Sequence, residues 1–229
     1  MYVFTYCTWF MCGYKIYEEI QPRMIHRRSF LSLVAALFLA PVGMYEQFLF
    51  WTGKINTMTS TTLHIEVVSF YLAYILIDTW NGCTAYPEFF TLVDGWAHHL
   101  STAAFAWISW YVGMSRVFAL SMIVEVPTVL LQLDRVVGDE WTKTLRRTFF
   151  PALFVSNRIL LLGLFVWKLQ DFPDIQVSYL TFCRVFYTGF TIMNLHWLRL
   201  MMRKKKQQTP HPPIIIPAVE VDPLSHNED

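Results

Sequence analysis

The stretch Asp94-Gly95-Trp96-Ala97-His98-His99-Leu100-Ser101-Thr102 opens an otherwise apolar, aromatic-rich segment that continues to about Gly113. Two adjacent histidines cost little in a water-soluble helix. At the head of a membrane-spanning helix they are expensive to bury, so they require a polar partner or a wet cavity. The pair therefore indicates a site, provided that this segment crosses a membrane.

The composition of the chain favours a membrane environment. Of its 229 residues, 55% are hydrophobic, 17% aromatic and only 15% charged, whereas a soluble domain carries about 25% charged residues. The net charge of +1 provides no general attraction to nucleic acid, so we expect no such partner. The four scattered cysteines lack metal-ligand spacing, which predicts apolar filler and no metal site.

Seven apolar segments have about the length that crosses a bilayer core, roughly 20 residues. Trp and Tyr stand at many segment ends, as an interfacial aromatic belt requires. Alternation of the basic loops predicts an amino terminus outside and a carboxyl terminus in the cytosol. Six crossings, with the first segment lying on the surface, is the alternative. The predicted segments are 2–17, 29–51, 61–80, 94–113, 116–133, 148–167 and 177–202.

The predicted fold class is therefore all-α, a polytopic membrane helical bundle of about seven transmembrane helices. We divide the chain into three parts. Residues 1–27 form an amino-terminal transmembrane helix and a basic loop, and residues 28–206 form the main transmembrane domain. Residues 207–229 contain five prolines and are predicted to be a disordered cytosolic tail.

Helical spacing predicts how the polar groups of the histidine segment face. Asp94, His98 and Thr102 are four residues apart and share one face of an α-helix, so Asp94 can accept a hydrogen bond from His98 and set its tautomer. His99 is turned away from that face by about 100°. Asp78, at the end of the preceding segment, is interpreted equally well as a site residue or as an ordinary helix-end residue.

Three later segments carry further polar residues at membrane depth. Pro127 has no N–H and leaves a backbone carbonyl of its helix without a donor. Arg158 is predicted to be a counter-ion of Glu125 or Glu46 rather than a substrate clamp. The polar stripes are Ser121, Glu125, Thr128 and Gln132 on the fifth segment, and Tyr187, Thr191 and Asn194 on the seventh.

Two interpretations of this polar set remain open from the residues alone. In the first, His98 or His99 is a general base in a cavity that opens to the cytosol, with a carboxylate orienting it. In the second, the histidines and acids only join helices by interhelical hydrogen bonds. Cation or proton transport is a weaker interpretation, because the chain has no repeat of the kind that many transporters carry.

The same residues, taken in order, resemble the TLC-domain family, which includes the ceramide synthases and the translocating-chain-associating membrane protein. The resemblance covers roughly residues 28–206. The matching features are Asp78 after an aromatic helix, His98-His99-Leu100-Ser101-Thr102, Glu125-Val126-Pro127, Arg158, and Asn194-Leu195-His196-Trp197 before a basic patch.

This resemblance implies a six-helix core with an extra amino-terminal helix, located in the endoplasmic reticulum. In ceramide synthases, paired histidines in an intramembrane cavity serve the transfer of a fatty-acyl group from acyl-CoA to a sphingoid base. Carried over by position, His98 and His99 would be the catalytic pair, acyl-CoA the co-substrate, and membrane lipids the partners, with no tightly bound cofactor. The supporting cavity residues are Asp78, Asp94, Thr102, Glu125, Gln132, Arg158 and Asn194.

One departure separates this chain from the ceramide synthases, which carry further aspartates and a His-Asp pair on the helix after the double histidine. Here that helix has Glu125-Val126-Pro127-Thr128, which resembles the TLC-domain-containing proteins linked to membrane phospholipid composition. Besides a lipid acyltransferase, we therefore expect two alternatives. These are a non-catalytic lipid-binding protein and a scaffold subunit with membrane-protein partners.

Overall fold

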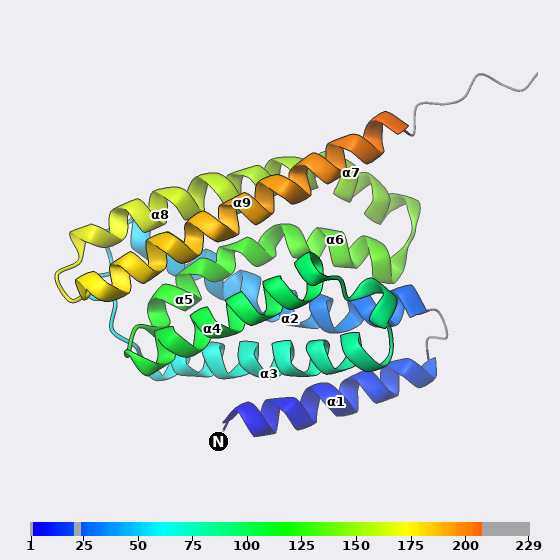
Figure 1. Ribbon diagram of the computed structural model, residues 1–229, viewed down its shortest axis with the longest axis horizontal. Coiled ribbons are helices and arrows are strands. Elements are labelled where there is room, and N and C mark those ends of the chain that lie inside the picture. The colour runs from blue at the N-terminus through cyan, green and yellow to red at the C-terminus, as the bar shows by residue number, and fades with distance from the viewer. Residues whose placement is uncertain (1, 21–23, 208–229) are drawn as a thin grey trace, which may run out of the picture. The chain divides into compact units, whose positions relative to one another are not determined.

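The computed structural model describes residues 2–20 and 24–207, and every regular element in these ranges is helical (Figure 1). The all-α prediction is thereby confirmed for the described ranges, while the predicted tail, 207–229, lies outside them apart from Gln207, the last residue of the final helix. Two compact units are present, Met1–Ile192 and Met193–Asp229. The longer helices are α1 (Tyr2–Ile20), α2 (Met24–Trp51), α3 (Thr62–Thr84), α4 (His98–Tyr111), α6 (Glu125–Val137), α7 (Glu140–Val155) and α9 (Val177–Gln207).

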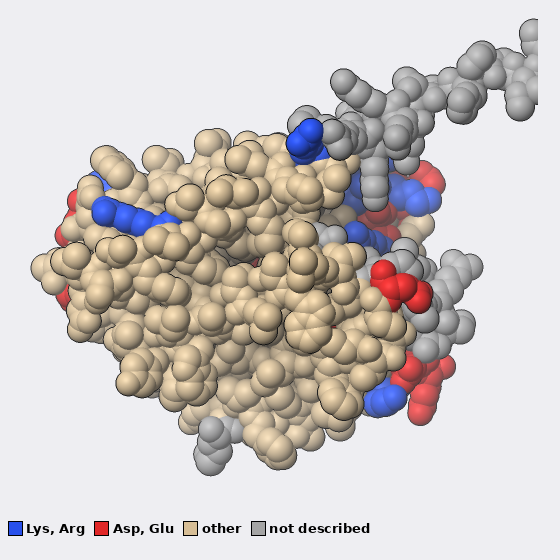
Figure 2. Space-filling model, in the orientation of Figure 1, with Lys and Arg blue, Asp and Glu red and all other residues tan. Residues whose placement is uncertain are grey.

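Four helical segments in the described ranges are long and apolar enough to cross a membrane. Three of them extend beyond the predicted limits. In two of these, Ser115–Val137 and Glu140–Asp171, helical structure continues through turns whose charges end the apolar pattern. In one such place Arg146 of α7 forms an ion pair with Asp134 of α6. Figure 2 shows charged side chains near the ends of the helices and an uncharged surface between them. The four segments are Ser29–Trp51, Thr62–Thr84, Ser115–Val137 and Glu140–Asp171.

Three short turns interrupt the α-helical winding, and each lies at a predicted site residue. A π-helical turn at Leu92–Ala97 leads directly into His98, the first residue of α4. A 3₁₀ turn at Met122–Val124 joins α5 (Ser115–Ser121) to Glu125. A second π-helical turn, Ser156–Leu161, joins α7 to α8 (Leu162–Lys168) and contains Arg158. Such irregular turns in long helices are frequent at functional sites.

The backbone of α2 lies directly against the 3₁₀ turn that precedes Glu125. The contact is made at Gly43, where an added Cβ would stand 2.2 Å from the backbone nitrogen of Ile123 and 2.8 Å from the carbonyl oxygen of Met122. Only a residue without a side chain permits this approach, as at other close helix contacts in membranes. Gly43 therefore sets the distance between α2 and the turn that positions Glu125.

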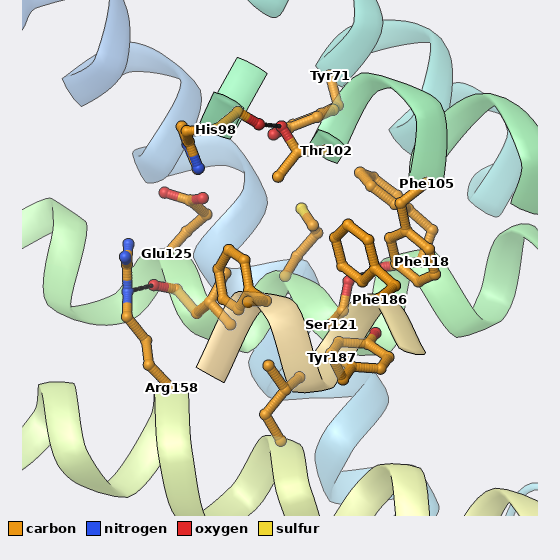
Figure 3. Close-up of a pocket in the computed structure, with 14 residues that line it drawn as sticks. Tyr71, His98, Thr102, Phe105, Phe118, Ser121, Glu125, Arg158, Phe186 and Tyr187 are labelled. Atoms are coloured by element: carbon orange, nitrogen blue, oxygen red, sulfur yellow. Dashed lines mark hydrogen bonds between the residues drawn. The ribbon is translucent and has the colours of Figure 1, made fainter. Parts of the chain in front are cut away.

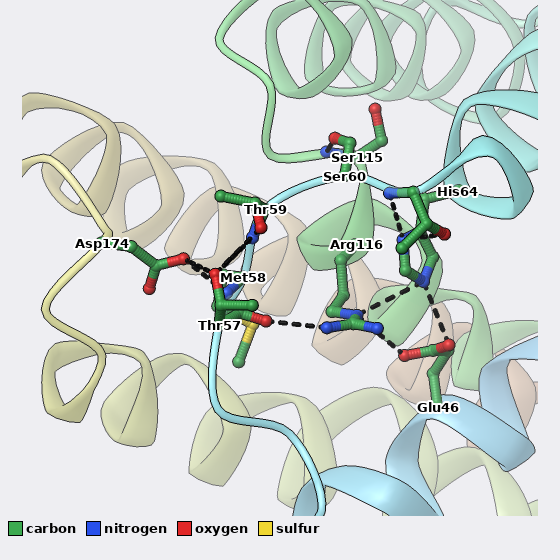
Figure 4. A network of polar contacts seen from close by, with 10 residues as sticks. Glu46, Thr57, Met58, Thr59, Ser60, His64, Ser115, Arg116 and Asp174 are labelled. Carbon is green, nitrogen blue, oxygen red and sulfur yellow. Dashed lines mark hydrogen bonds and ion pairs between the residues drawn. The ribbon is translucent and has the colours of Figure 1, made fainter.

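A buried polar network holds the loop between α2 and α3 (Figure 4). His64 Nε2 lies 3.0 Å from Glu46 Oε1, and Arg116 Nε lies 3.4 Å from Glu46 Oε2. Arg116 also donates to the carbonyl oxygen of Thr57 at 2.8 Å. Glu46 is thus paired with Arg116, which leaves Glu125 as the predicted counter-ion of Arg158. The hydropathy pattern had no means of choosing between two arginines on different helices.

We predict that Gly43→Ala lowers the stability of the protein by about 1–3 kcal/mol, because the new methyl group meets backbone atoms that cannot rotate away. The measurement is thermal unfolding in mild detergent. Gly163→Ala is the matched control, since an added Cβ there meets nothing within 4 Å. An unchanged melting temperature for Gly43→Ala would contradict the close contact between α2 and the 3₁₀ turn.

Candidate functional site

A narrow pocket lies inside the first unit, where residues at all three irregular turns come together (Figure 3). Its polar side chains include His98, Glu125 and Arg158, which come from three different helical segments. Its walls are largely aromatic. The pocket has an empty volume of about 380 Å³, a figure that includes open solvent at its mouth. The aromatic lining residues are Tyr71, Phe105, Phe118, Phe186, Tyr187 and Phe190.

His98 is the pocket histidine. Figure 3 shows its ring directed toward the carboxylate of Glu125. The ring of Phe190 on α9 lies 6.4 Å from that of His98, measured between centroids. One turn further along α4, Thr102 donates its hydroxyl hydrogen to the backbone carbonyl of His98 at 2.7 Å, which ties this residue to the first turn. His98 is therefore a partly buried residue whose ring lies in a largely apolar surrounding.

Arg158 braces the helix that carries Glu125. Its Nε donates to the carbonyl oxygen of Val124 at 3.0 Å, and its Nη2 donates to the hydroxyl of Thr128 at 2.6 Å. Val124 is the N-cap of α6, and Thr128 lies in the first turn of that helix. The guanidinium group thus ties the start of α6 to the π-helical turn Ser156–Leu161, and it places a positive charge beside Glu125.

His99 faces away from the pocket and is held on both ring nitrogens. Nδ1 lies 2.8 Å from the hydroxyl of Thr79, and Nε2 lies 3.4 Å from Asp78 Oδ2. Tyr86 donates to the other oxygen of Asp78 at 3.1 Å. A carboxylate opposite Nε2 favours the tautomer with the proton on that nitrogen, so Nδ1 accepts from Thr79. With both nitrogens engaged, His99 has no position left for a ligand.

Phe90 packs between α3 and the π-helical turn that precedes the double histidine. Its ring lies between Gly82 of α3 and Gly95 of the π-helical turn. An added Cβ would approach the ring to 2.3 Å at Gly82 and to 2.8 Å at Gly95. The same ring packs edge-on against His99, with centroids 5.2 Å apart. Gly95, in the stretch that opens the histidine segment, is therefore needed for this close approach.

The structure brings together only part of the predicted site. His98, Thr102, Glu125 and Arg158 line the pocket. Asp78 instead contacts His99, and Gln132 is buried outside the pocket lining, where it accepts from Arg135 Nη1 at 3.4 Å. The side chain of Asp94 lies outside what the structure describes. Asn194 belongs to the second unit, and its side chain is buried.

The residues that sequence reasoning missed are those that hold His99, namely Thr79, Tyr86 and Phe90. Thr79 follows Asp78 directly, but its role depends on how α3 packs against α4, and no spacing within one helix reveals that. Gly82 and Gly95 offered a weak signal, because paired small residues often mark a place where a bulky group inserts. Among the described residues, no three His, Cys, Asp or Glu side chains come together as metal ligands.

Comparison with protein-family models and with curated protein sequences gives no match for this chain. The geometry of the pocket therefore carries the functional conclusion. Chemically, the pocket offers an imidazole, a carboxylate and a guanidinium group at one end and a hydrocarbon-like surface along the rest. Such a site can accept a proton from a bound group while excluding bulk water.

We predict that Glu125 and Arg158 are energetically coupled. Glu125→Gln or Arg158→Met alone should lower stability by about 2–4 kcal/mol, because each change leaves an opposite charge buried without compensation. The double variant should lose clearly less than the sum of the two. A double-mutant cycle from thermal or denaturant unfolding measures the difference. Strict additivity would show that the two charges do not interact.

Proposed function

We propose that this chain is a multi-pass membrane protein of the TLC-domain type that transfers an acyl group from acyl-CoA to an amine or hydroxyl of a lipid. The observation that carries the proposal is the convergence of His98, Glu125 and Arg158 at one pocket whose other walls are largely aromatic. An amphipathic substrate matches that lining, with its reactive polar group beside His98 and its hydrocarbon part against the rings.

In the proposed reaction, His98 removes the proton from the attacking amine or hydroxyl. The nucleophile then adds to the thioester carbonyl, the new C–N or C–O bond forms, and the C–S bond breaks. His98 returns its proton to the departing thiolate of CoA, which balances the step. Glu125 stabilises the imidazolium ion that forms between these events, and Arg158 holds the first turn of the helix that carries Glu125 through Val124 and Thr128. His99 acts as a positioning residue through Asp78 and Thr79.

The proposed topology has seven crossings, with the amino terminus outside and the carboxyl terminus in the cytosol. It adds α1, the helix at residues 92–111 and α9 to the four segments that are apolar enough by themselves. Residues 28–206 then form the TLC-type domain, most simply placed in the endoplasmic reticulum membrane. In this orientation His98 lies near the cytosolic side, where a soluble CoA thioester arrives.

A non-catalytic lipid-binding protein, or a scaffold subunit of a larger membrane complex, is the second candidate. The observation that favours it is the narrowness of the pocket, whose lining side chains leave little room between them. A lipid enters only if aromatic side chains such as Phe186 and Phe190 rotate. The presence of Glu125 where ceramide synthases carry aspartates agrees with this candidate as well.

The test of the proposed function is a lipid-transfer assay with the purified full chain in nanodiscs, supplied with acyl-CoA and a panel of lipid amines and alcohols. We expect His98→Ala to reduce product formation at least about 100-fold, as loss of a general base does. His99→Asn should reduce it less, because it keeps a polar contact with Thr79 or Asp78. Thr188→Ala, an exposed change on α9, is the control.

Lipidomics of cells that express each variant provides the second measurement. If His98→Ala matches wild type in every lipid class while the protein stays folded, acyl transfer by this site is excluded and the non-catalytic candidate stands. Stoichiometric co-purifying membrane proteins in mild detergent would favour the scaffold form of that candidate.

A further inference from the structure

The pocket contains a second polar point, separate from the His98 end. Tyr187 of α9 lines the pocket with only 4% of its surface exposed, and its hydroxyl forms no hydrogen bond of regular geometry with the described residues, although Ser121 is near enough to interact with it. Ser121, from the end of α5, lines the same pocket and donates its hydroxyl hydrogen to the carbonyl of Phe118 at 2.6 Å. Figure 3 shows Ser121 and Tyr187 at the end of the pocket away from His98.

A second buried tyrosine on the same helix, Tyr179, has a hydroxyl that is hydrogen-bonded. Tyr179 is also 4% exposed, and its hydroxyl lies 2.8 Å from that of Ser109. Buried polar groups are nearly always hydrogen-bonded, and inside a bilayer no bulk water can substitute. The two tyrosines are eight residues apart and equally buried, so the lack of a regular hydrogen bond at Tyr187 is not a general property of α9.

The chemistry of the two hydroxyls defines what they can bind. Tyr187 can both donate and accept a hydrogen bond, whereas Ser121, having given its hydrogen to Phe118, can only accept. Together they offer one donor and two acceptors. A hydroxyl group satisfies both residues at once, while a ketone or ether oxygen only accepts and satisfies Tyr187 alone.

The rings around this point suit a hydrocarbon chain. Phe105 of α4 stacks on Phe186 with centroids 4.3 Å apart, and it meets Tyr187 edge-on at 5.3 Å. These contacts between α4 and α9 are made by flat rings, which can turn about their side-chain bonds and widen the slit without breaking a hydrogen bond. A hydrocarbon chain that enters between these rings passes next to the hydroxyl of Tyr187.

The geometry points to a hydroxyl-binding subsite, formed by Tyr187 and Ser121, that selects hydrocarbon chains carrying a hydroxyl group at a distance from the headgroup. This inference rests on the proposed function in one respect, namely that the pocket takes a lipid. The reactive group of the lipid lies at His98, and the second hydroxyl pairs with Tyr187. The subsite thus adds a substrate preference to the proposed site.

The test is a binding measurement on the full chain in nanodiscs, with three probes. They are a saturated long-chain primary alcohol, the diols that carry a second hydroxyl at stepped positions along the chain, and the corresponding keto alcohols. We expect the best diol to bind wild type roughly 3- to 10-fold more tightly than the plain alcohol, as one or two hydrogen bonds in a dry site provide. The keto alcohol at that position should gain less.

Tyr187→Phe should abolish the preference for the diol, and Tyr179→Phe should retain it. Thermal unfolding without a probe supplies an independent check. Tyr187→Phe should leave the melting temperature unchanged or raise it, because it removes a hydroxyl that forms no regular hydrogen bond, whereas Tyr179→Phe should lower it. Ser121→Ala should weaken the preference without reversing it.

Three results would overturn the subsite. If the plain alcohol binds and no diol binds more tightly, the subsite is wrong and the lipid-handling proposal stands. If Tyr187→Phe retains the diol preference, or lowers the melting temperature as much as Tyr179→Phe, its hydroxyl has another role. If none of the alcohols binds at all, both the subsite and a lipid-handling pocket are excluded.

Discussion

The cost of placing ionisable side chains among apolar helices determines how this protein is organised. Each charge near the centre of a membrane helix costs about 2.5–3.5 kcal/mol to insert, so it persists only where a partner meets it. Here the partners come from other helices. Arg158 contacts the backbone of the helix that carries Glu125, Arg116 neutralises Glu46, and His99 meets Asp78. Because each pairing joins distant parts of the chain, these contacts specify which helix faces meet.

The irregular turns are the second part of this arrangement. An unbroken α-helix offers one polar stripe per face, whereas a π-helical or 3₁₀ turn rotates the residues that follow it. His98, Glu125 and Arg158 all lie at or within such turns, and all three reach one pocket. The two adjacent histidines point in different directions from the start of α4. One ring enters the pocket, and the next, about 100° away, is fixed behind it by Thr79 and Asp78.

Sequence reasoning predicted the helical fold class, because it depends on composition and on spacing within single helices, and it selected polar residues of which four line one pocket. It did not predict the π-helical turn Leu92–Ala97 that leads into His98, and the expected hydrogen bond between Asp94 and His98 stays a prediction. It also left two counter-ions open for Arg158, since only packing shows that Glu46 belongs to Arg116. The contacts of His99 with Thr79 and Asp78 could not be predicted either, because they depend on how α3 packs against α4.

The central claim is that His98, and not His99, faces Glu125 inside the bundle. Cysteine cross-linking measures this directly in the full chain, after its four native cysteines are replaced. The pair His98→Cys with Glu125→Cys should cross-link rapidly with a short thiol-reactive reagent in native membranes, while His99→Cys with Glu125→Cys should remain unlinked. Equal cross-linking of both pairs, or linking of the His99 pair alone, would contradict the pocket described here.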